Sequence, residues 1–307
     1  MTMLNKKRSG KLAYLFPYME ESVRKLRTLG KIRTAETYQT ALSRFRRFRH
    51  GKDVRLADID DELMSAYERE LKESGLCANT TSFYMRILRA VYNRALKEGL
   101  IKDRRPFRYV YTGVDKTRKR AIDIRDVRRL AALNLDGRPA ETLARDLFLF
   151  SFYTRGMSFV DMAYLQKMDL HSGVLSYRRR KTGQMMFIRW EKCMEEIVAS
   201  YDNPSSVYLL PIITSSETDE RQQYVNMSHN INRSLKALGR KLGLTVPLTM
   251  YVARHTWANA ARQKNIPLSV ISEGMGHTSE MTTRIYLSSL DADIIDKANR
   301  KILKSLK

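Results

Sequence analysis

Three segments in the second half of the chain carry side chains that could act on a phosphate. The segment LTMYVARHTWANAARQ places Arg254 near the start of an expected helix, and GMGHTSEMTTRIYLSS places His277 after a glycine turn with Tyr286 nine residues later. Lys181 lies at the tip of an expected β-hairpin, beside Gly183. Cations that neutralise phosphate oxygens, a proton donor and a hydroxyl nucleophile together suit phosphoryl transfer without a metal. A phenol has a pKa near about 10, so Tyr286 would need nearby cations or a base.

The sequence lacks the motifs that are typical of ATP-dependent or metal-dependent enzymes. The sequence has no GxxxxGK[ST] loop for ATP and no HExxH, and its five histidines (50, 171, 229, 255 and 277) lack metal-ligand spacing. Its acidic residues fall mostly at expected helix starts and surface positions, whereas a two-metal nuclease needs carboxylates that converge. We therefore expect no metal and no cofactor.

The composition favours a polyanionic partner. The 307 residues include 56 Lys and Arg against 33 Asp and Glu, and the first 120 residues alone hold 29 against 14. An excess of this size, interleaved with aromatics, indicates nucleic acid, although charged faces can serve solubility alone. A membrane surface is the weaker alternative, since no single basic amphipathic helix dominates and no apolar run reaches about 18 residues.

The cysteines and the first residues of the chain indicate the cellular compartment of the protein. Cys77 and Cys193 form neither a disulfide framework nor a zinc cluster, which favours a reducing environment. The beginning of the chain has no pattern typical of a signal peptide. We expect a cytoplasmic, nucleoid-associated protein.

The first part of the chain predicts a helical bundle over residues 12–105. Helices are expected at about 18–28, from Thr34 to about His50, from Asp60, and from Asn79 or Thr80 to Gly99. The second of these helices could contact phosphates through four arginines: Arg44, Arg46, Arg47 and Arg49. Residues 101–120 lose the helical period, and we expect a basic linker over 106–116, with a loop that merely happens to be basic as the alternative.

The remainder, 117–307, predicts an α+β domain. Helices are expected near 123–133, 139–153, 192–201, 222–243, 250–264, 268–275, 279–287 and 291–305. The segment GVLSYRRRKTGQMMFIRW predicts a β-hairpin with a Thr-Gly turn. The expected fold class is mainly α, with an N-terminal helical bundle that binds DNA and an α+β catalytic domain that contains a small antiparallel sheet.

These motifs together resemble the tyrosine recombinase, or phage-type integrase, family. The resemblance rests on Arg254-His255-Thr256, Gly276-His277 and Tyr286 in that order and spacing, and on Lys181-Thr182-Gly183. Residues 116–122, KTRKRAI, are similar to the family's linker into its catalytic domain. The resemblance implies that Tyr286 attacks DNA to form a 3′-phosphotyrosine bond and that Arg254 and His277 bind the phosphate. It further implies that Lys181 protonates the leaving 5′ oxygen and that Lys116, Arg118, Lys119 and Arg120 contact DNA.

The chain departs from the family pattern at two positions. The family's histidine three residues before the second arginine is Tyr251 here, whose phenol can donate a hydrogen bond to phosphate. The family's first arginine lies three residues before an acidic residue, a slot that Asp161 assigns to Ser158. We expect Arg155 to substitute, re-aimed by Gly156.

Each site residue also has a structural interpretation. Tyr286 could be a packing residue, His277 a helix cap, Lys181 a solvated hairpin tip or simple phosphate contact, and Arg254 an ion-pair partner of Asp161 or Glu273. The amphipathic segment 291–305 could pack on its own domain. In the family, a C-terminal segment docks on a neighbouring subunit.

The function that the resemblance implies is site-specific recombination of duplex DNA. The implied partners are duplex DNA with inverted-repeat core sites, a homo-tetramer on that DNA, and an accessory DNA-bending protein. Two alternatives stay open: a DNA-binding protein of this fold without chemistry, for which Ser158 and Tyr251 argue, and a nicking-closing enzyme similar to type IB topoisomerases.

Overall fold

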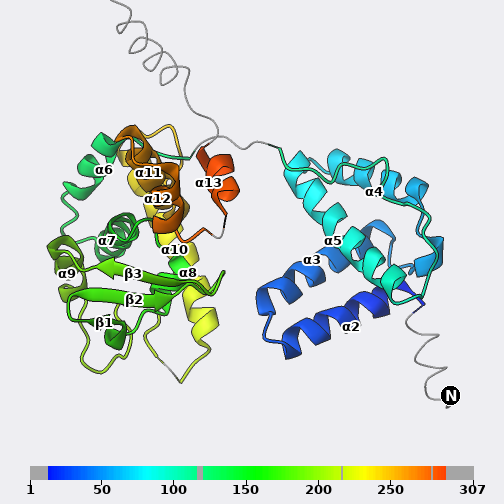
Figure 1. Cartoon of the computed structure of the whole chain (residues 1–307), viewed down its shortest axis with the longest axis horizontal. Coiled ribbons are helices and arrows are strands. Elements are labelled where there is room, and N and C mark those ends of the chain that lie inside the picture. The colour runs from blue at the N-terminus through cyan, green and yellow to red at the C-terminus, as the bar shows by residue number, and fades with distance from the viewer. Residues whose placement is uncertain (1–12, 116–119, 216, 278, 288–307) are drawn as a thin grey trace, which may run out of the picture. The chain divides into compact units, whose positions relative to one another are not determined.

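The computed structural model describes residues 13–115, 120–215, 217–277 and 279–287, the last four by their backbone only. The chain divides into two compact units, Met1–Thr117 and Arg118–Lys307, and Figure 1 shows the elements of each. Helices predominate, and the described strands form one three-stranded antiparallel sheet in the second unit. The expected fold class is therefore confirmed.

The first unit is a helical bundle. Its elements are α2 (Leu15–Thr28), α3 (Ile32–Phe48), the 3-10 turn η1 (Leu56–Asp58), α4 (Asp61–Glu73) and α5 (Ala78–Lys97). The core contains Phe45 and Tyr67, both fully buried, with ring centroids 4.9 Å apart and an edge-on arrangement. Asp60, where the sequence predicts the start of a helix, caps α4 by accepting a hydrogen bond from the amide of Leu63 at 2.9 Å.

Two expectations for this unit need correction. Helix α3 begins at Ile32, before Thr34, because the carbonyl of Lys31 already accepts from the amide of Ala35 at 3.0 Å. Residues 101–115 are not an extended linker. Val110 is buried in the bundle core, and Arg108 pairs with Asp61 at 2.7 Å. Apolar contacts and side-chain bonds hold this irregular segment on the helices, so it belongs to the first unit.

The second unit carries most of the described elements. They are α6 (Ile124–Ala131), α7 (Pro139–Tyr153), α8 (Phe159–Ala163), η2 (Lys167–Asp169), β1 (Leu170–His171), β2 (Val174–Arg178), β3 (Met185–Arg189), α9 (Lys192–Ala199), α10 (Glu220–Lys241), α11 (Met250–Gln263), α12 (Leu268–Gly274) and α13 (Glu280–Leu287). Most lie where the sequence predicts them. The short α8, the 3-10 turn and β1 were not expected, since each is too brief for a periodic pattern.

Helix α7 occupies the centre of this unit. Four consecutive residues, 147–150, are buried, so the helix is apolar on all sides rather than on one stripe. It contacts α6, α9, α10 and α11. Figure 1 shows the sheet on one side of α7 and α11 on the other. The hairpin, which carries Lys181, and α11, which carries Tyr251 and Arg254, are thus both built around one core.

Candidate active site

The second unit contains a cavity of about 1050 Å³ that is lined by several separate segments. They are the turn before α8, the β2–β3 hairpin, α10, the start of α11, the turn after α12, and α13. The basic lining residues are Arg179, Lys181, Arg233, Lys236 and Arg254, and the described lining includes no Asp or Glu. Cations without carboxylates in a concave site favour an anionic ligand.

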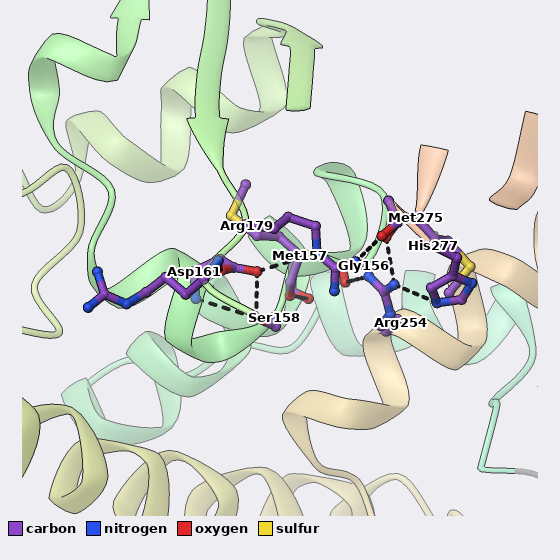
Figure 2. A network of polar contacts seen from close by, with 11 residues as sticks. Gly156, Met157, Ser158, Asp161, Arg179, Arg254, Met275 and His277 are labelled. Atoms are coloured by element: carbon purple, nitrogen blue, oxygen red, sulfur yellow. Dashed lines mark hydrogen bonds and ion pairs between the residues drawn. The ribbon is translucent and has the colours of Figure 1, made fainter. Parts of the chain in front are cut away.

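Arg254 is fixed at the wall of this cavity. Its side chain is buried, and its guanidinium donates to the carbonyl of Gly156 at 2.8 Å and to that of Met275 at 2.7 Å. A methyl group on Gly156 would lie 2.7 Å from Cα of Arg254, so the backbone turn at residue 156 must approach α11 closely. Two segments distant in sequence therefore orient one cation, as Figure 2 shows.

His277 lies directly beside Arg254. Nη2 of Arg254 is 2.9 Å from Nε2 of His277, and Nδ1 of His277 is 2.6 Å from Oγ1 of Thr283. Because a guanidinium can only donate, Nε2 accepts and Nδ1 carries the proton. Burial first, and then the charges of Arg254, Arg179 and Lys181, together lower the pKa of His277 to about 4. The imidazole is therefore neutral at pH 7.

Arg179 is a cavity residue that the sequence analysis missed. It follows β2 directly, it is 6% exposed, and its Nη1 donates to the carbonyl of Gly276. Nε lies 3.8 Å from Oδ2 of Asp161. The alternation of the strand could have revealed it, since Leu175 and Tyr177 face the core and Arg179 is the next residue on that face.

Lys181 and Tyr251 also line the cavity, as predicted, and both side chains are exposed. The ring of Tyr251 packs edge-on against His255, with centroids 4.4 Å apart. His255 is not among the described lining residues; burial, and then the charges of Arg120 and Arg254, lower its pKa to about 4. Tyr286 lies on α13, and its side chain is outside the described part of the structure.

The structure places Arg155 away from the described lining of the cavity. Helix α7 ends at Tyr153, and Arg155 and Gly156 both have left-handed backbones, with φ of 62° and 76°. This turn carries Arg155 to Gly274, where a methyl group would lie 3.7 Å from its Cδ. The described cavity lining does not include Arg155.

Ser158 lines the cavity, and its hydroxyl plays a local structural role. It caps α8, and its hydroxyl donates to Oδ2 of Asp161 at 2.7 Å. Oδ1 of Asp161 accepts from the amide of Arg180 at 2.9 Å. Asp161 therefore ties the hairpin to α8, and its ion-pair partner is Arg179, as Figure 2 shows.

The four arginines predicted to contact DNA from α3 do not share one face. Arg44 pairs with Glu70 on α4 at 2.9 Å, whereas Arg46 pairs with Glu20 on α2 at 2.7 Å. Arg47 is exposed, and Arg49 is half-buried. Of the predicted linker contacts, Arg120 is exposed, while Lys116, Arg118 and Lys119 lie outside the described residues.

Family models match both units of the chain. A model described as the phage integrase SAM-like domain matches residues 14–110, and one described as the phage integrase family matches residues 166–293. Tyrosine recombinase XerA of Thermococcus kodakarensis is 24% identical over 250 residues, which cover 80% of this chain and 82% of the relative. The chain belongs to the tyrosine recombinase family. This tyrosine recombinase is accordingly an enzyme of site-specific DNA recombination.

Solved tyrosine recombinase structures share the fold. The Tn1549 transposon integrase in complex with a circular intermediate DNA superposes with a TM-score of 0.69 at 14% identity, covering 92% of this chain and 99% of the other. A lambda integrase tetramer bound to a Holliday junction superposes with a TM-score of 0.65 at 16% identity, covering 91% and 82%. At such identities the likeness concerns the fold alone.

Neither a metal cluster nor a membrane-spanning helix occurs in the described part of this recombinase. Within residues 13–115, 120–215, 217–277 and 279–287, no group of three or more His, Cys, Asp or Glu side chains could hold a metal ion. Over the same ranges, no helix combines the length and the apolar character needed to cross a bilayer.

Proposed function

We propose that this recombinase cuts and rejoins duplex DNA through a 3′-phosphotyrosine at Tyr286, without metal or ATP. One observation carries the proposal: Arg254, His277, Lys181 and Tyr251, predicted from three separate segments, all line the same cavity, whose described lining is basic and has no acidic side chain. Such an array stabilises charge that develops on phosphate oxygens.

The proposed step is one transesterification. The phenolic oxygen of Tyr286 forms a bond to phosphorus while the bond from phosphorus to the 5′ oxygen breaks. The phenolic proton leaves to water, and Lys181 gives a proton to the 5′ oxygen and recovers one from water. Arg254 donates to the phosphate oxygens with its planar guanidinium. The ester bond keeps the energy of the phosphodiester, so a free 5′ hydroxyl can reverse the step on a new strand.

The hydrogen bonds of the cavity suggest how it changes when DNA binds. Nη2 of Arg254 now points at Nε2 of His277, and both atoms would face the phosphate in the proposed complex. Neutral His277 can donate from only one nitrogen, so a bond from Nε2 to the phosphate requires the proton to move from Nδ1. Tyr251, with an exposed phenol at the cavity wall, supplies a further hydrogen bond in the place of the family's histidine.

We further propose that the two units bind duplex DNA with inverted-repeat core sites and act as a homo-tetramer, with an accessory DNA-bending protein as a candidate partner. The cavity cations and the exposed Arg47 and Arg120 support the DNA contact. The segment 291–305, predicted to dock on a neighbouring subunit, lies outside the described residues. Truncation after Ser289 should block pairing of two sites and spare binding to one site.

Covalent capture tests the chemistry and finds the substrate. Duplex fragments of the genomic DNA on both sides of the coding region are nicked at random and incubated with the protein. Cleavage close to a nick releases a short strand with a 5′ hydroxyl, which traps the enzyme on the DNA. Denaturing extraction and sequencing of the adducts then identify the site. The matched control for Tyr286→Phe is Tyr109→Phe, because Tyr109 is 68% exposed in the other unit.

The outcomes separate the proposed function from its alternatives. Adducts with the wild type and Tyr109→Phe, but none with Tyr286→Phe, support the proposed nucleophile. Specific binding without any adduct would identify a DNA-binding protein instead. If adducts form but two captured sites never exchange strands, the enzyme only nicks and closes DNA.

A further inference from the structure

The cavity needs a second fixed cation, and Ser158 does not supply it. In the transition state of the proposed step, negative charge spreads over the phosphate oxygens, and fixed donors on more than one side stabilise it best. Arg254 supplies a fixed donor on one side of the phosphate. Ser158 is neutral, and its hydroxyl is already engaged by Asp161 at 2.7 Å. The charge must therefore come from another element.

We propose that Arg179, at the end of β2, is the second phosphate-binding arginine of this enzyme. The proposal rests on the proposed function. Arg179 and Arg254 reach the same turn from opposite elements, because Nη1 of Arg179 donates to the carbonyl of Gly276 and Nη2 of Arg254 donates to the carbonyl of Met275. Both guanidiniums therefore lie beside the same turn, where a single phosphate could accept from both. Both side chains are buried, yet both line the cavity.

Arg179 has a donor left for a ligand. Its described contacts engage Nη1, through Gly276, and Nε, through Asp161. Nη2 has no partner among the described residues, and it is not one of their buried unsatisfied atoms. A buried guanidinium with one available edge at the wall of a cavity is suited to donate to a bound anion.

Asp161 makes this arginine rigid before DNA binds. The carboxylate is buried, with its Oδ2 3.8 Å from Nε of Arg179 and its Oδ1 2.9 Å from the amide of Arg180. The hairpin turn is closed by the amide of Gly183, which donates to the carbonyl of Arg179 at 2.8 Å. A donor held in place needs no reorganisation during the reaction, which is where catalytic electrostatics gain most.

A purely structural interpretation of Arg179 makes different predictions. As an anchor, it would only join the hairpin to the turn at Gly276. Its removal would then slow cleavage equally for any phosphate, and a cation placed on another element would not compensate. As a phosphate ligand, it would be dispensable when the phosphate carries no charge.

The test uses the duplex recovered by covalent capture, made with either a normal scissile phosphate or a neutral methylphosphonate. With the phosphate, Arg179→Gln should form the adduct about 100-fold or more slowly than the wild type. With the methylphosphonate, the wild type and the variant should react at nearly equal rates. Arg189→Gln is the matched control, since Arg189 is an exposed arginine on β3 outside the described lining, and it should react like the wild type with both substrates.

A double variant places a new positive charge at residue 158 in a protein that has lost the charge of Arg179. Ser158→Arg in the Arg179→Gln background should recover at least about a tenth of wild-type adduct formation with the normal phosphate. Equal losses with both substrates, together with no recovery in the double variant, would overturn the proposal. If Arg179→Gln does not fold, Arg179→Met keeps a long side chain without the charge and carries the same comparison of substrates. If the wild type forms no adduct, the proposed function fails first, and this inference fails with it.

Discussion

Replacing Gly276 by alanine should damage the turn that both cavity arginines hold. A methyl group at this position would lie 2.7 Å from Cδ of Arg179 and 2.8 Å from Sδ of Met186. The backbone φ of 63° adds strain, since a residue with a Cβ avoids the left-handed region. Arg179 and Met186 must therefore move, and the carbonyl that Arg179 binds must move with them.

A control variant separates the expected loss of stability into a part due to backbone strain and a part due to overpacking. Gly243, after α10, has a φ of 68°, but a methyl group added there would meet nothing within 4 Å, so Gly243→Ala carries backbone strain alone, about 1–2 kcal/mol. Gly276→Ala adds an overpacking cost of about 1–3 kcal/mol. In a domain of this size, each kcal/mol lowers Tm by roughly 2–4 °C, so the two variants should differ by several degrees in a thermal melt.

Adduct formation on the captured duplex gives the functional half of this prediction. Gly243→Ala should react like the wild type at a temperature where both variants are folded. Gly276→Ala should be slower by roughly 100-fold, the loss typical of one misplaced oxyanion donor. If the two alanine variants have the same Tm and the same adduct rate, then Arg179 does not contact the Gly276 turn as the structure shows, and the reasoning fails.

Three further predictions concern other parts of the catalytic unit. Arg155→Ala should lower Tm, through lost contacts at Gly274, and leave adduct formation within about threefold of the wild type; a loss comparable to that of Arg254→Ala would return Arg155 to the site. The folded-state pKa of His277, about 4, is below its ordinary 6.5, so the unfolded chain binds the proton first and stability should fall as pH drops from about 6.5 to 4. Denaturant titrations should show a smaller fall in His277→Gln, and an unchanged fall would mean that the ring is not held neutral. Replacing the exposed cavity cations Arg233 and Lys236 by glutamine should reduce the slope of log affinity against log salt by about 0.9 for each, as measured by DNA binding; an unchanged slope would place them off the phosphates.

Elements with strong local signals could be predicted from the sequence. Pro139 stands at the first position of α7, Asp60 caps α4, and the Thr-Gly turn closes the hairpin. Local capping, turn chemistry and helical period decide these features, and all of them are visible in a single sequence. The family resemblance, rather than any local signal, implied that Arg254 and His277 bind one phosphate, and the structure places the two side chains 2.9 Å apart.

The features that the sequence did not predict depend on long-range packing. Arg155 was expected at the cavity because it is near Asp161 in sequence, yet two left-handed residues at the end of α7 send it elsewhere. Val110 was expected in a linker, but it completes the core of the first unit without any periodic neighbours. Arg179 stands in the run Arg178, Arg179 and Arg180, which looks like one solvated cluster until the alternation of the strand separates its middle member.

The position of Arg179 on the hairpin has a consequence for the chemistry. Arg179 and Lys181 are two residues apart on one turn, so the proposed phosphate ligand and the proposed acid for the leaving group move together. Contacts with Asp161 and Gly276 dock that turn on the rest of the unit: Oδ1 of Asp161 accepts from the amide of Arg180 at 2.9 Å, and the carbonyl of Gly276 accepts from Arg179. Undocking the hairpin would therefore remove charge stabilisation and protonation in a single motion, while Arg254 and His277 stayed in place. An arginine on the hairpin, rather than on α8, thus makes two catalytic functions depend on the docking of one hairpin.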